Sequence, residues 1–111
     1  QPLVTMNDDV YVEAAQALAR RMAQADGDVA AKARFGFRLC LAREPSDREL
    51  SIYSSLFEAA REKYAVNEDL ATKMAVGPLP APPSEMDVAD LAAWTVVGTT
   101  LLNLDEMFLK R

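Results

Sequence analysis

The segment from Met86 to Phe108 constrains the fold most, because its pattern is that of one helix that is apolar over much of its circumference. A helix of this kind is normally buried, so other helices must surround it. Its strongest stripe has helical spacing and consists of Trp94, Val97, Leu101, Leu104 and Phe108. Gly98 lies within the same segment, at a cost of roughly 1 kcal/mol in helix propensity relative to alanine. A second helix that crosses closely at this glycine would explain that cost.

Four further segments carry the apolar period or the start signals of a helix. The first runs from Asp8 to Ala25, and the second follows Asp28 as far as about Leu41. The third runs from about Asp47 to Tyr64, and Asn67 is placed to cap a short extra helix through Met74. No segment alternates apolar and polar residues with a period of two, so no strand is predicted. We therefore predict an all-α fold, a compact three- to four-helix bundle with a buried C-terminal helix.

A proline-rich stretch at about residues 77–84 precedes the last predicted helix. Each proline removes an amide donor, so we expect an extended surface connection there. A chain of 111 residues is long enough for one domain and too short for two ordinary ones. We therefore predict a single domain over residues 1–111. Because the first residue is Gln1 rather than Met, we expect a piece of a longer protein or a processed chain.

The clearest local signal lies between the second and third predicted helices, in the stretch Arg43–Glu49. Pro45 biases the residue before it out of the helical region. Ser46 and Glu49 have the spacing of a capping box, in which each side chain accepts a hydrogen bond from the backbone amide of the other residue. The sequence therefore predicts a helix, a tight connection and a second helix.

Composition argues against several functional classes. The chain has 12 basic and 17 acidic residues, and its net charge of −5 disfavours non-specific binding to nucleic acid. It has no histidine, which removes the commonest general base and the commonest metal ligand. No apolar run approaches the ~20 residues of a membrane helix, so we expect no membrane insertion of this segment. No glycine-rich phosphate loop, serine elbow or zinc-ligand spacing occurs. We predict no catalytic, cofactor-binding or metal site and no enzymatic activity.

Single reactive residues have structural explanations. Cys40 could act as a nucleophile, but a thiol needs a base, and its position on an apolar helical line predicts a buried structural cysteine. It joins the predicted core, which comprises Phe37, Cys40, Phe57, Trp94, Leu101 and Phe108. Asp8, Asp9 and Glu13 could offer oxygen ligands to a hard cation, but their spacing matches no calcium loop. Acidic residues at a helix start account for them.

Asp105 and Glu106 are the remaining acidic candidates. Neighbouring helical residues point about 100° apart, so this pair does not converge on one substrate atom. In a regular helix Asp105 falls within the apolar stripe and needs a partner, since a buried unpaired carboxylate is too costly to persist. We predict a structural polar clamp of Arg43, Asp105 and Glu106, with Arg38 or free backbone amides at a helix start as other partners and Glu106 in a supporting or surface role. Alternatively, the helix ends near Asn103 and Asp105 faces water.

Three blocks that span nearly the whole chain carry a family resemblance: PLVTMND at residues 2–8 with VEAA at 12–15, FRLCLAREPSDREL at 37–50, and AWT at 93–95 with LLNLDEMF at 101–108. Together they resemble the C-terminal part of the large planctomycete cytochrome-c-associated proteins, in a domain family of unknown function. Ala42 stands where that family has glycine, and Glu44 stands where it has proline.

This resemblance implies a large exported or periplasmic multidomain parent protein of which the chain is the C-terminal fragment, often with a haem-binding cytochrome c segment elsewhere. A c-type haem needs a Cys-x-x-Cys-His motif, and this chain has one cysteine and no histidine, so we expect no cofactor here. We predict a non-catalytic structural or protein-interaction module, with other domains of the parent or other proteins as partners. The alternative is a ligand-binding accessory domain, for example for carbohydrate, or part of an enzyme of polysaccharide breakdown, either of which predicts a concave site with aromatic platforms.

Overall fold

The structure, a computed structural model, describes the backbone of residues 9–76 and 87–109 and the side-chain surroundings of residues 12–76 and 87–104. These residues form five helices and no strand, which confirms the all-α prediction. The helices are α1 (Asp9–Gln24), α2 (Val29–Leu41), α3 (Asp47–Ala65), α4 (Glu68–Ala75) and α5 (Val88–Leu109). The proline-rich connection predicted at residues 77–84 lies outside the described residues.

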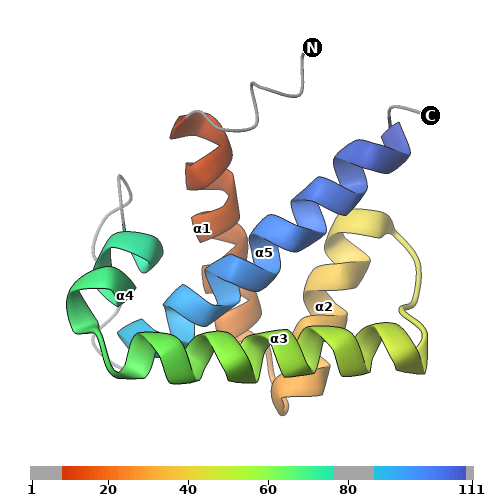
Figure 1. Cartoon of the computed structure of the whole chain (residues 1–111). Helices are drawn as coiled ribbons and strands as arrows, with labels where there is room; N and C mark the ends of the chain where they lie inside the picture. Colours follow the sequence, from red (N-terminus) through yellow and green to blue (C-terminus); the bar gives the residue numbers. More distant parts are fainter. Residues whose placement is uncertain (1–8, 77–86, 110–111) are drawn as a thin grey trace.

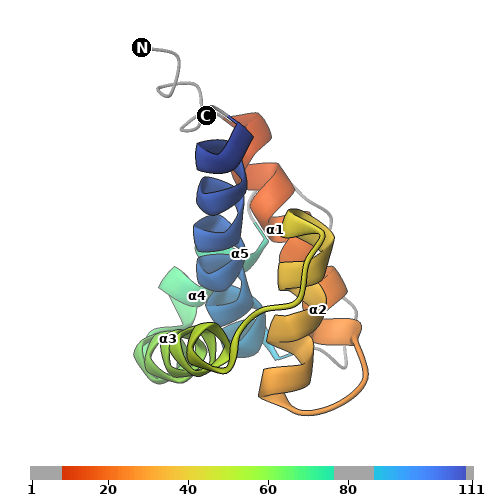
Figure 2. The same ribbon diagram turned by 90° about the vertical axis from the view of Figure 1, so that its right-hand side faces the viewer.

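Helix α5 is the centre of the bundle and contacts each of the other four helices. Figure 1 shows α3 across the base of the molecule, with α4 following at one end and the α2–α3 connection at the other, while α5 runs diagonally. In Figure 2 the same α5 stands upright between α3 and the top of the molecule. Its buried side chains include Leu91, Trp94, Val97 and Leu101, so the prediction of a buried C-terminal helix is confirmed. Within the described residues, no helix combines the length and apolar character needed to cross a membrane.

Two glycines allow helices to approach one another closely. A Cβ atom on Gly98 of α5 would lie 3.2 Å from the carbonyl oxygen of Ala15 in α1, so the close helix crossing predicted at this glycine is confirmed. A Cβ atom on Gly36 of α2 would overlap the thioether of Met22, which is itself fully buried. Met22 therefore fills the space between α1 and α2 that a larger residue at position 36 would need.

Aromatic pairs join α3 to its neighbours. The ring centroids of Phe57 and Trp94 lie 4.3 Å apart, and Phe37 meets Tyr53 edge to face at 6.0 Å. Aromatic contacts of this kind add to the stabilisation that burial alone provides. Phe37, Phe57, Trp94 and Leu101 are buried, as the sequence predicts.

Cys40 is only partly buried, which corrects the prediction that it belongs to the buried core. It follows Phe37 by three residues, so it lies about 60° around the helix from the side chain that faces the centre. Cys40 therefore packs against the margin of the core. The side chain of Phe108, the last predicted core residue, lies outside the described residues.

Polar contacts fix two helix ends. The side-chain amide of buried Gln16 in α1 donates to the carbonyl oxygen of Met74 near the end of α4, at 2.8 Å. Arg61 of α3 pairs with Asp87 and Asp90 at the start of α5. Carboxylates at the start of a helix also interact favourably with the helix dipole. Asp87 and Asp90 therefore stabilise the start of α5 and, through Arg61, hold it against α3.

Candidate functional site

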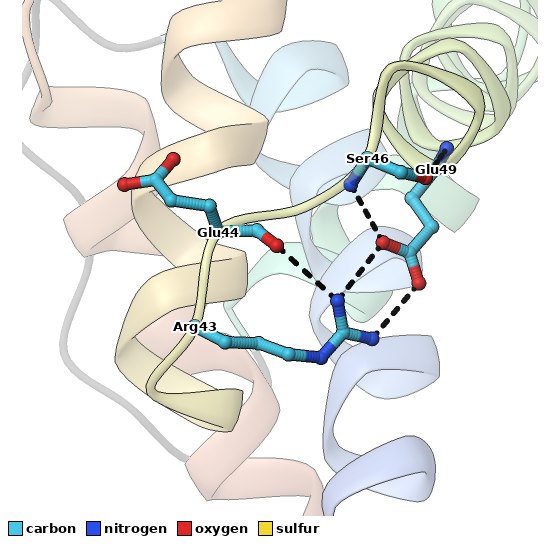
Figure 3. A network of polar contacts seen from close by, with 4 residues as sticks. All are labelled: Arg43, Glu44, Ser46 and Glu49. Atoms are coloured by element: carbon cyan, nitrogen blue, oxygen red, sulfur yellow. Dashed lines mark hydrogen bonds and ion pairs between the residues drawn. The ribbon is translucent and has the colours of Figure 1, made fainter.

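The site is the connection between α2 and α3, where the sequence places its clearest local signal. Helix α2 ends at Leu41, and the next residue, Ala42, caps it. Ala42 has φ 58° and ψ 31°, and its N–H donates to the carbonyl oxygen of Arg38. Ala42 is in the left-handed conformation that usually requires glycine, because a Cβ atom is crowded there. This turn separates the side chains that follow: in Figure 3 the carboxylate of Glu44 points away from the guanidinium of Arg43.

Arg43 and Glu49 form a two-point ion pair across the connection (Figure 3). Arg43 Nη2 lies 2.9 Å from Glu49 Oε2, and Nη1 lies 3.2 Å from Oε1. Nη1 also donates to the backbone carbonyl oxygen of Glu44 at 3.2 Å. Two parallel hydrogen bonds between a guanidinium and a carboxylate fix the relative orientation of the two groups more tightly than one hydrogen bond does. The pair therefore fixes the path of the chain between the helices.

The carboxylate of Glu49 also closes the capping box of α3. It accepts from the N–H of Ser46 at 2.7 Å, while the Ser46 hydroxyl accepts from the N–H of Glu49 at 3.1 Å. Both hydrogen bonds of the motif are thus present, and Pro45 directly precedes the cap. One carboxylate serves both the helix start and the ion pair.

The electrostatics follow from these contacts. The hydrogen bond from Arg43, together with that from the Ser46 amide, lowers the pKa of Glu49 to about 2, against a smaller opposing effect of desolvation. The hydrogen bond to Glu49 in turn raises the pKa of Arg43. The Arg43 guanidinium also lies over the ring of Phe37, 4.8 Å from its centroid. The ion pair is thereby joined to a residue of the buried core.

Glu44 forms a second, separate contact set on the outer side of α2. Its Oε1 lies 2.8 Å from Arg34 Nε, and its Oε2 lies 3.2 Å from Arg38 Nε. The hydrogen bond from Arg34 lowers the pKa of Glu44, so this carboxylate is charged at neutral pH.

Beside Glu44 the surface is hollowed. The hollow is open to solvent, has a volume of about 580 Å³, and is lined by Phe35, Arg38, Leu39, Ala42, Arg43 and Glu44. Leu39 is a large aliphatic residue, and 42% of it is exposed. The arrangement combines apolar surface with guanidinium groups, which suits binding of an anionic and partly apolar ligand.

The structure assigns Arg43 a partner that the sequence analysis did not foresee. Glu49 holds its guanidinium, whereas the side chains of Asp105 and Glu106 lie outside the described residues, so the clamp stays a prediction. Helix α5 continues to Leu109, and the alternative that it ends near Asn103 is wrong. Asp8, one of the three acidic residues that the sequence analysis explains by the helix start rather than by a cation, lies outside the described residues. In the described part of the chain no three His, Cys, Asp or Glu side chains are grouped to hold a metal ion.

Comparison with known proteins shows the family. The family model PSD1, described as a protein of unknown function (DUF1553), matches residues 1–57. The chain belongs to this family. The PSD1 match contains α1, α2, the α2–α3 connection and the first half of α3, and so it includes every residue of the two contact sets above. No curated protein and no solved structure matches the chain. The PSD1 description is silent on cytochrome c, on export and on the source organism, so these parts of the resemblance stay predictions.

Proposed function

We propose that this chain is a non-catalytic structural or protein-interaction module of a larger exported multidomain protein. The observation that carries the proposal is the hollow beside α2, where exposed Leu39 lies among arginine side chains. Apolar surface that is rimmed by polar groups is typical of interaction sites. Export and the multidomain parent, with this chain at its C-terminal end, rest on the family resemblance of the three sequence blocks.

The charged groups at the connection suit binding better than acid–base catalysis. A general acid or base works best with a pKa near the operating pH. The pKa of Glu49 is about 2, that of Glu44 is lowered, and that of Arg43 is raised. All three side chains therefore keep their charge at neutral pH and do not exchange protons with a substrate. The proposal includes no cofactor, because one cysteine without histidine provides no attachment for a c-type haem.

Carbohydrate binding, the alternative, needs exposed aromatic rings on which a sugar can stack. Most aromatic side chains in the described residues are instead used in packing, and Phe35, which is partly buried, is the one aromatic residue in the lining of the hollow. Trp94, Phe37, Phe57 and Tyr53 are all buried. We therefore favour a protein partner over a glycan.

A two-part experiment tests the proposal. Residues 1–111 and the remainder of the longer protein are purified separately and mixed in an isothermal titration calorimeter, and residues 1–111 are also applied to a glycan array. The proposal predicts association of the two polypeptides in trans and no selective glycan binding. Selective binding to a glycan, without association in trans, would overturn it in favour of the carbohydrate-binding alternative.

A further inference from the structure

Helix α2 has a basic outer face in an acidic protein. It carries Lys32, Arg34 and Arg38 and no acidic residue, while the whole chain has a net charge of −5. The Lys32 ammonium donates to backbone carbonyl oxygens at the end of α1, so this charge is directed into the fold. Arg34 and Arg38 lie on the outer side and share the carboxylate of Glu44. Two positive charges thus face one negative charge, and the α2 face retains positive potential.

The apolar part of this face follows the helix. Phe35 and Leu39 are spaced i and i+4, which places them one above the other on α2, and both line the hollow together with Ala42, the residue that caps the helix. Cations lie beside these apolar residues: the Arg21 guanidinium of α1 lies 5.9 Å from the centroid of the Phe35 ring, and Arg38 lines the hollow. A partner that matches this face therefore presents an apolar segment to Phe35 and Leu39 and carboxylates to the neighbouring arginines.

Glu44 shows how a carboxylate fits here and why it can be exchanged. Its side chain is 52% exposed, and it reaches the two arginines from the connection rather than from a helix. Its backbone is held independently, because Arg43 bonds to the Glu44 carbonyl oxygen. The side chain can therefore rotate away while the connection keeps its path. An exposed ion pair of this kind contributes little to stability, so its exchange for another carboxylate costs little.

We infer that the hollow beside α2 binds an acidic, apolar segment of a partner polypeptide. A carboxylate of that segment replaces Glu44 on Arg34 and Arg38, and an aliphatic or aromatic side chain packs on Leu39. This inference rests on the proposed function, because it names the chemistry of the partner that such a module would bind.

A polypeptide fits this face better than other anionic partners do. Recognition of anionic lipid surfaces generally uses clusters of roughly four to eight basic residues, and here two arginines already share a carboxylate. Nucleic acid would meet a protein of net charge −5. A polypeptide segment, in contrast, supplies a carboxylate and a large apolar side chain at adjacent positions.

The test uses a fluorescent synthetic peptide of about 15 residues, near the shortest length that holds a helix in water. It is built from leucine, glutamate and alanine, with leucine at helical spacing, and a matched peptide has glutamine in place of every glutamate. Fluorescence anisotropy with residues 1–111 should show binding of the acidic peptide. We expect the glutamine peptide to bind at least ~10-fold more weakly, a difference of about 1.4 kcal/mol. Equal binding of the two peptides would overturn the inference.

Matched variants locate the peptide on the protein. Arg38→Glu should abolish binding, whereas Lys73→Glu makes the same charge change on α4 and should preserve it. Leu39→Ser should weaken binding severalfold, whereas Ile52→Ser, at an exposed position of α3, should not. Equal effects within either pair would overturn the inference, because binding would then not depend on the α2 face.

Glu44→Ala tests the exchange of carboxylates directly. Removal of this side chain frees both arginines, so the acidic peptide should bind severalfold more tightly, and unchanged affinity would overturn the exchange. Binding to phosphatidylserine vesicles that Arg38→Glu abolishes would overturn the inference in favour of a membrane. Self-association in the analytical ultracentrifuge that the same substitution abolishes would overturn it in favour of a second copy.

The failure of this inference is distinguishable from that of the proposed function. If the acidic peptide does not bind but residues 1–111 associate with the remainder of the longer protein, the partner chemistry is wrong and the module stands. If residues 1–111 bind neither the acidic peptide nor the remainder of the longer protein, both proposals are wrong.

Discussion

Arg43 and Glu49 face one another across the α2–α3 connection, with Nη2 2.9 Å from Oε2, and the same carboxylate closes the capping box of α3. The guanidinium also covers the ring of Phe37. One local ion pair therefore joins a helix start, the preceding connection and the edge of the core.

The two roles of Glu49 can be separated by substitution. Glutamine can still accept a hydrogen bond from the Ser46 amide, whereas alanine removes both the cap and the ion pair. Glu49→Ala should lower the free energy of unfolding by about 1 kcal/mol, the usual cost of losing a cap. Glu49→Gln should cost clearly less, as measured by urea denaturation at pH 7. If the two variants lost the same unfolding free energy, the hydrogen bond to the Ser46 amide would contribute nothing, and the stabilisation would come from the charge of Glu49 alone.

Acid should remove the contribution of Glu49 to stability. Its pKa is about 2 in the folded protein and about 4.3 in an unfolded chain, so the unfolded state takes up protons first as the pH falls. The stabilisation is fully present above pH ~4.5 and is lost as the pH falls towards 2. The difference in unfolding free energy between wild type and Glu49→Gln should therefore narrow below pH ~4.5 in a series of denaturation curves. A constant difference down to pH ~2 would argue against the ion pair.

Ala42 is a site where a smaller residue should stabilise the protein. Its left-handed conformation costs an L-residue roughly 1–2 kcal/mol, and glycine adopts it freely. Ala42→Gly should raise the unfolding free energy by up to about 1 kcal/mol, because greater freedom of the unfolded chain offsets part of the relief. The control is Ala59→Gly, at an exposed position inside α3, which should destabilise by about 1 kcal/mol. If Ala42→Gly lowered the unfolding free energy as Ala59→Gly does, residue 42 would not be in the left-handed conformation that favours glycine.

Gly36 should not tolerate a methyl group. Gly36→Ala would push a Cβ atom into the thioether of Met22, and overpacking of this kind typically costs 1–3 kcal/mol. Met22→Ala opens the same space, so the double variant should be more stable than the sum of the two losses predicts. Additive losses in this double-mutant cycle, measured by thermal unfolding, would show that the two residues do not compete for space.

The features that the sequence predicted are those with local causes. Helix period and the caps at Asp28, Ser46 and Asn67 act within one element or at its visible ends. Gly98 could be predicted because its low helix propensity stands out within its own segment, although the helix that crosses there could not be named. The role of Gly36 was not predicted, because the sequence does not show that Met22 of another helix lies against it. The left-handed Ala42 was not predicted either, since alanine gives no signal for that conformation.

The candidate site shows the same limit. The spacing of Ser46 and Glu49 predicts their pairing, whereas the apolar stripe of the last helix pointed to Asp105, far along the chain, as the partner of Arg43. Long side chains can reach several acidic residues, and only the path of the connection decides that Glu49 is the one in contact. The hollow beside α2 depends on the path that the connection takes after the left-handed Ala42, and no sequence pattern predicts that path.

Side-chain footprinting of the full-length protein tests the central claim, that the α2 face is an interaction surface, most directly. Hydroxyl radicals should modify both Leu39 and Ile52 in the isolated chain, since 42% and 54% of these residues are exposed. In the full-length protein of which we propose this chain is a part, Leu39 should be modified much more slowly, while Ile52 serves as the reference and keeps its rate. Equal rates at Leu39 in the isolated chain and in the full-length protein would contradict the claim.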